Sequence, residues 1–66
     1  MISDEAMEIL RILTPEWMAV DNHLYLEMPV FRELFCLGLV QSKWMGGKMH
    51  INLTSSASQF VPNMFN

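Results

Sequence analysis

The sequence predicts a small α+β domain with three helices, a two-stranded antiparallel hairpin and a short C-terminal helix. Apolar residues recur at the helical period in two stretches, residues 2–13 and residues 29–37. Further along, apolar and polar side chains alternate on both sides of two adjacent glycines, Gly46 and Gly47. A glycine pair between two such runs is typical of a tight hairpin turn, because glycine adopts the positive φ values that the turn requires.

The composition limits the class of protein. Sixty-six residues form one small domain, and 52% of them are hydrophobic while 17% are charged, which is too apolar for a disordered chain. The single cysteine, Cys36, excludes a disulfide scaffold, and no apolar run approaches the roughly 20 residues that a membrane-spanning helix needs. The first residues lack the basic start of a signal peptide, so we expect a cytoplasmic location. We expect one domain over residues 1–61, followed by a tail over residues 62–66.

Two helices carry clear start or stop signals. The first is expected over residues 4–13, with Ser3 as its N-terminal cap and acidic residues in its first turn, where they suit the helix dipole. Another begins at Pro29, runs through residues 29–37 and ends at Gly38, which is suited to a left-handed C-terminal cap.

The remaining helices rest on shorter signals. Thr14 and Pro15 form a cap followed by proline, which predicts a helix over residues 14–21. Residues 23–28 fit either a short strand or a tight connection. A capping box in residues 56–61 predicts a short C-terminal helix.

The hairpin spans residues 39–54, and its register follows from pairing Met45 with Lys48. The other predicted pairs are Trp44 with Met49, Lys43 with His50, Ser42 with Ile51, Gln41 with Asn52 and Val40 with Leu53. This register places nearly all apolar residues on one face and mostly polar residues on the other, whereas a slip by one residue would destroy the separation. We therefore expect one face on the core and one in water.

A family resemblance rests on three short runs taken in order. Leu37-Gly38-Leu39-Val40, then Gly46-Gly47-Lys48, then Leu53-Thr54 resemble the end of the recognition helix, the wing and the start of the next helix in winged helix-turn-helix domains. The likeness is to MarR-like and PadR-like bacterial regulators, and it covers about residues 29–61. The resemblance implies a winged-helix scaffold, and in that family usually DNA binding through the third helix and the wing.

The charge distribution argues against duplex DNA as the main partner. Residues 1–33 hold all seven acids and two of the four bases, a balance of −5, while residues 34–66 hold two lysines, a balance of +2. Four bases neutralise few phosphates, so a DNA-binding transcription regulator is the alternative hypothesis. Its candidate contacts are Arg32, Lys43, Lys48 and His50. A third hypothesis is an acidic protein that mimics DNA.

Our leading hypothesis is a small regulatory or adaptor protein that binds a protein partner or a second copy of itself, as a homodimer. Seven Met, four Phe and two Trp are more than a 66-residue domain can enclose, and Met-rich surfaces adapt to partners. The residues that we expect at the interface are Tyr25, Trp44, Met45 and Phe65. The small size also suits an accessory protein of a phage or mobile element.

Catalytic and metal sites are not expected. The sequence has no nucleophile beside a base, no phosphate-binding glycine loop and no paired carboxylates on opposing elements. Cys36, His23 and His50 are too far apart in the chain for a zinc motif. We therefore predict no enzymatic activity, no cofactor and no metal.

Overall fold

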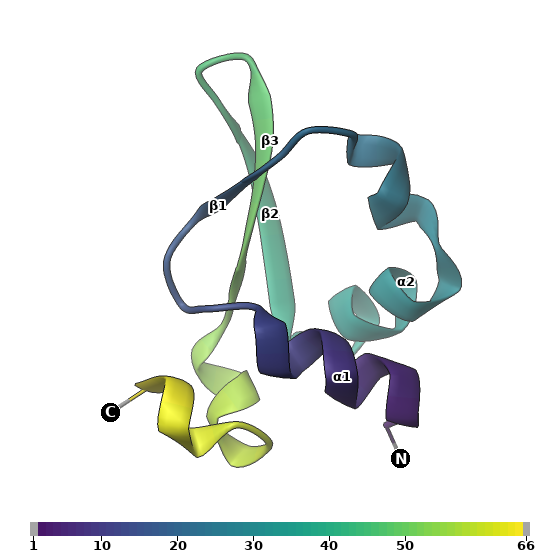
Figure 1. Ribbon diagram of the computed structural model, residues 1–66, viewed down its shortest axis with the longest axis vertical. Coiled ribbons are helices and arrows are strands. Elements are labelled where there is room, and N and C mark those ends of the chain that lie inside the picture. The colour runs from purple at the N-terminus through teal and green to yellow at the C-terminus, as the bar shows by residue number, and fades with distance from the viewer. Residues whose placement is uncertain (1, 66) are drawn as a thin grey trace.

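The computed structural model describes residues 2–65 and shows an α+β fold. Two α-helices, three strands and three short 3-10 helices follow one another along the chain (Figure 1): α1 (Asp4–Ile12), β1 (Met18–Val20), η1 (His23–Glu27), α2 (Pro29–Cys36), β2 (Val40–Met45), β3 (Lys48–Leu53), η2 (Ser55–Gln59) and η3 (Pro62–Phe65). The strands form one antiparallel sheet in the order β1-β3-β2. The helices lie toward one end of the sheet, and the turn between β2 and β3 projects away from α1 (Figure 1).

The prediction of three helices and a two-stranded wing is wrong, because residues 14–21 form no helix. Their carbonyl oxygens bond to β3 instead: Thr14 O accepts from Leu53 N at 2.9 Å, and Pro15 O accepts from Asn52 Nδ2 at 2.8 Å. Further on, β1 pairs with β3, with Met18 opposite Ile51. The helix-start signal was local. It is overridden because β3 has a second edge whose backbone groups need partners.

The other main elements agree with the sequence. The Ser3 side chain caps α1 by accepting a hydrogen bond from Ala6 N at 3.2 Å, and α2 begins at Pro29. Gly38 follows α2 with a φ of 71°. All six predicted pairs between β2 and β3 are present, so the predicted register is confirmed.

Residues 23–28, which the sequence left open between a short strand and a tight connection, contain the 3-10 helix η1. Asn22 caps η1 through its side-chain oxygen, which accepts from Leu24 N at 3.0 Å. The predicted short C-terminal helix is η2, a 3-10 helix rather than an α-helix, and η3 follows it. Met64 and Phe65 in η3 are partly buried against the core.

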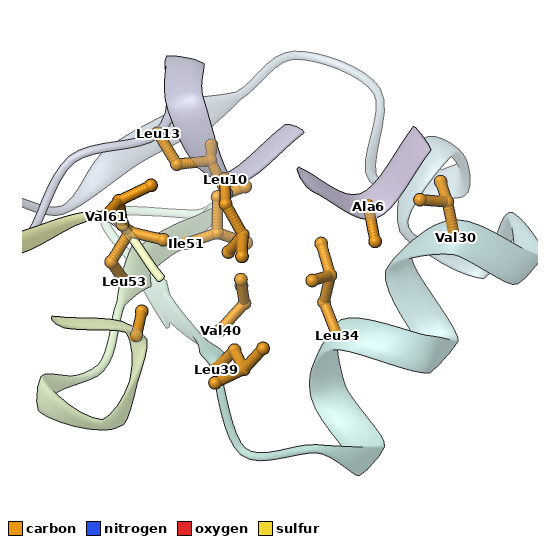
Figure 2. Close-up of a cluster of buried hydrophobic side chains, with 11 residues drawn as sticks. Ala6, Leu10, Leu13, Val30, Leu34, Leu39, Val40, Ile51, Leu53 and Val61 are labelled. Atoms are coloured by element: carbon orange, nitrogen blue, oxygen red, sulfur yellow. The ribbon is translucent and has the colours of Figure 1, made fainter. Parts of the chain in front are cut away.

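The core fills the space between the two α-helices, the sheet and the start of η2 (Figure 2). Its buried members are Ala6, Leu10, Leu13, Val30, Leu34, Leu39, Val40, Ile51, Leu53, Ala57 and Val61. The hairpin extends beyond this cluster, because six residues of strand span about 20 Å whereas the nine residues of α1 span about 13 Å. Trp44 lies on the inner face of the sheet, the face that carries Val40. Because it lies beyond the core cluster, its side chain is 58% exposed.

One residue of the predicted water-facing side of the hairpin is buried. Asn52 is 8% exposed, because the chain before β1 passes beside it and accepts its hydrogen bond at Pro15. The same face of the sheet carries Lys43, whose ammonium nitrogen lies 4.3 Å from the centre of the Trp17 ring. That segment therefore partly covers a face that the sequence predicted to be solvated.

Candidate functional site

An apolar groove of about 450 Å³ lies where α1, β1, η1 and α2 meet. Eleven of its twelve lining residues have apolar or aromatic side chains, and the twelfth is Glu5. A second cavity of about 320 Å³, beside η3, is more polar and includes Arg11. Because binding sites are concave and mostly apolar with few polar groups, the larger groove is the candidate functional site.

The helical period of α1 directs one of its faces to the groove. Glu5, Ile9 and Leu13 are spaced four residues apart and line the groove, whereas Ala6 and Leu10 are fully buried in the core. This is the expected behaviour of side chains at positions i and i+4 of a helix, which lie on the same face. The groove and the core are thus built from neighbouring faces of the same helix.

The short strand β1 forms another wall, and all three of its residues line the groove. Successive side chains of a strand point to opposite faces, so a wall that includes Met18, Ala19 and Val20 extends along the edge of the strand. That edge is free among the described strands, since β1 is an outer member of the sheet. The strand that the sequence failed to predict therefore completes the groove.

Apolar side chains at the margin of the groove are open to solvent. Met18 is 38% exposed, Met28 46% and Tyr25 59%, and all three line the groove. Two more exposed side chains lie nearby, since Leu24 precedes Tyr25 in η1 and the Trp44 ring lies 5.8 Å from the ring of His23, the first residue of η1. Exposed apolar side chains gathered near one groove are typical of an interaction site.

The structure separates the four residues that the sequence suggested for a protein interface. Tyr25 lines the groove, and Trp44 contacts the beginning of η1. Met45 is half-buried next to the hairpin turn, and Phe65 packs against the core from η3, far from η1 (Figure 1). Only Tyr25 and Trp44 are thus associated with the elements around the groove.

Sequence reasoning missed most of the groove lining. Ile9, Val20, Leu26 and Phe31 are half-buried residues that line it. Their apolar character is equally typical of core residues, so no local pattern distinguishes them. The one signal in the sequence that pointed to this groove was the large number of methionines. Two of them, Met18 and Met28, line the groove.

Three of the four candidate nucleic-acid contacts share one face of the hairpin, because Lys43 pairs with His50 and Lys48 precedes His50 by two residues on β3. Arg32 is exposed on α2, whereas the other three are on the hairpin. Lys43 is placed over the Trp17 ring. Lys48 is exposed beside the turn, and its carbonyl oxygen lies 3.0 Å from Nδ1 of the half-buried His50.

Within residues 2–65, no cluster of three His, Cys, Asp or Glu side chains has the arrangement of a metal site. No helix in this part of the chain is long and apolar enough to cross a membrane. In comparisons with known proteins, no family model, no curated protein and no solved structure matches the chain.

Proposed function

We propose that this chain is a non-catalytic regulatory or adaptor protein that binds an apolar segment of a protein partner in the groove between α1, β1, η1 and α2. The observation that carries the proposal is the groove itself, almost entirely apolar, with Met18, Tyr25 and Met28 exposed at its margin. Tyr and Met are enriched at protein interfaces, and flexible Met side chains adapt to the shape of a partner.

The size of the groove suits a few side chains of a partner helix. β1 offers only three residues of free edge, so backbone pairing with a partner strand would contribute little and side-chain burial must supply the affinity. A helix presents three or four apolar residues on one face at positions i, i+3, i+4 and i+7. Each buried side chain contributes about 1.5–3 kcal/mol, and association opposes this by at least about 4 kcal/mol. Four side chains at about 2.5 kcal/mol each leave about 6 kcal/mol net, so we expect a dissociation constant of about 10–100 µM.

The test uses a fluorescein-labelled amphipathic helical peptide with leucines at those four positions and uncharged glutamine flanks. We expect Tyr25→Ser and Met28→Ser each to weaken its binding at least fivefold in a fluorescence anisotropy titration. The matched control is Leu37→Ser, because Leu37 is 51% exposed but does not line the groove. Absence of binding at about 1 mM protein, or equal losses in all three variants, would refute the proposal.

A second copy of the chain is a second candidate partner, favoured by the free edge of β2. β2 is the other outer strand of the sheet, six residues long, and it carries the exposed Trp44. Two such edges can pair about a two-fold axis and join the sheets of two copies. Sedimentation velocity at protein concentrations from about 10 to about 500 µM, a range suited to a weak dimer, tests whether two copies associate. A dimer that Trp44→Ser abolishes supports it, and a monomer throughout contradicts it.

A DNA-binding regulator has less support from the arrangement of cations. Arg32 lies on α2 rather than on the hairpin, and within residues 40–53 only Lys43 and Lys48 carry a permanent positive charge. Few phosphates can then be neutralised together, and DNA affinity scales with that number.

A further inference from the structure

Acidic residues surround the groove that we propose as the binding site. Glu5 is its only charged lining residue. Asp21 directly follows the lining residue Val20, and Glu27 stands between the lining residues Leu26 and Met28. Consecutive Cα atoms are about 3.8 Å apart, so both backbone positions lie within a Debye length, about 8 Å at physiological ionic strength, of the groove lining.

Basic residues do not balance these acids. No Lys or Arg lines the groove, and Arg32, next to Phe31 on α2, is the only base adjacent in sequence to a lining residue. Arg11 lines the second cavity, and Lys43 lies over Trp17 on the sheet. Glu5, Asp21 and Glu27 against Arg32 give a local charge of −2, and by the same criterion Asp4 and Glu8, which adjoin the lining residues Glu5 and Ile9, add two further negative charges.

A second copy of the chain is a poor occupant for a groove with this charge. A symmetric dimer brings the same surface of both copies together, so Glu5, Asp21 and Glu27 of one copy would lie near the same three residues of the other. Like charges at an interface disfavour association, whereas opposite charges favour it and accelerate encounter. The charge therefore selects a partner that is different from this chain and locally basic.

We infer that the occupant of the groove is a cationic amphipathic helix, with an apolar face flanked by Lys or Arg, on a partner protein. Its apolar side chains enter between α1 and β1, and its basic side chains lie near Glu5, Asp21 and Glu27. This inference rests on the proposed function and adds the chemical class of the partner to it.

The experiment compares three fluorescein-labelled peptides that share the four leucines and differ only in their flanks, which carry lysine, glutamine or glutamate. At about 50 mM salt, we expect the lysine peptide to bind three- to tenfold more tightly than the glutamine peptide, and the glutamate peptide to bind most weakly. The preference should decline to less than twofold at about 1 M salt, where the Debye length is about 3 Å.

A charge-neutralised variant locates the effect. We expect the combined substitutions Asp21→Asn and Glu27→Gln, at two exposed positions that do not line the groove, to reduce the preference for lysine flanks at least twofold without weakening the glutamine peptide. The control is the double variant Gln41→Lys and Ser55→Lys, which raises the net charge by the same two units at exposed positions that do not line the groove. Its preference should match that of the unmodified chain.

Each alternative outcome is distinct. If the lysine and glutamine peptides bind equally and Met28→Ser weakens both, the inference about charge is wrong while the proposed function stands. If no peptide binds but a small apolar dye does so in a manner sensitive to Met28→Ser, the groove is a small-molecule site and both are wrong. If the chain self-associates and Met28→Ser abolishes this, the occupant is a second copy and the inference is overturned.

Discussion

Replacing Asn52 with aspartate tests whether one buried hydrogen bond holds the segment before β1 against β3. Asn52 is 8% exposed, and its Nδ2 donates to the Pro15 carbonyl oxygen at 2.8 Å. The substitution places an acceptor where the donor stands, so two oxygen atoms face each other. Rotating the carboxylate does not relieve this repulsion, because both of its oxygens are acceptors. No donor lies near the position of Oδ1 either, since Oδ1 of Asn52 has no hydrogen-bond partner among the described residues.

The expected loss of stability from Asn52→Asp is about 2–4 kcal/mol. The lost hydrogen bond accounts for about 1 kcal/mol, and an unpaired charge at a buried position adds about 1–3 kcal/mol. For a 66-residue chain the total free energy of unfolding is about 3–10 kcal/mol, so a large fraction of the stability is affected. The corresponding fall in the melting temperature is about 8–30 °C.

Thermal and urea unfolding followed by circular dichroism measure the effect. Asn52→Ala removes the bond without adding charge and should fall between the unmodified chain and Asn52→Asp. Gln41→Glu is the matched control, because Gln41 is the exposed cross-strand partner of Asn52 and undergoes the same amide-to-carboxylate change. We expect it to change stability by less than about 0.5 kcal/mol. If Asn52→Asp unfolds no more easily than Gln41→Glu, the role assigned to the Pro15 bond is wrong.

Three further experiments test local features. Gly46 has a φ of 58° in the hairpin turn, so we expect Gly46→Val to lower the unfolding free energy by about 1–2 kcal/mol and Gly46→Asn to be nearly neutral. Ser3 donates from Oγ to Glu33 Oε1 at 2.9 Å and from its backbone N to Oε2 at 2.9 Å. A double-mutant cycle with Ser3→Ala and Glu33→Ala should give a coupling energy of about 0.5–1 kcal/mol, and a value of zero would show that the contact contributes nothing. Lys43→Ala should leave binding of the leucine peptide unchanged, because Lys43 does not line the groove, whereas a large loss of duplex-DNA affinity measured by anisotropy at low salt would favour the DNA-binding alternative.

Sequence patterns predicted the elements whose signals are contained within their own residues. The spacing of apolar side chains identified α1 and α2, and Ser3 and Gly38 marked their ends. The hairpin register was predicted in full, because the two glycines define the turn and the pleat then assigns every side chain to a face. In each case the decisive interactions lie within one short stretch of chain, the widest being the pair of Val40 with Leu53.

Longer-range interactions explain the errors. Thr14 and Pro15 carry a good helix-start signal, but their carbonyl oxygens bond to β3, nearly forty residues later in the chain. The pleat assigned Trp44 to the inner face of the sheet, yet the helices are too short to cover it. The register determines the face of the sheet on which a side chain lies. Whether other elements cover that side chain depends on their lengths, about which the register contains no information.

The candidate site shows the same division. Tyr25 and the methionine excess suggested an apolar surface, and the acids of the N-terminal half were evident from composition. Their convergence at one groove depends on four segments, α1, β1, η1 and α2, which meet only when the chain has folded. Periodicity describes which side of an element is apolar, because that is a property of neighbouring residues. It cannot specify which apolar sides will enclose one another, because that is settled by contacts between distant parts of the chain.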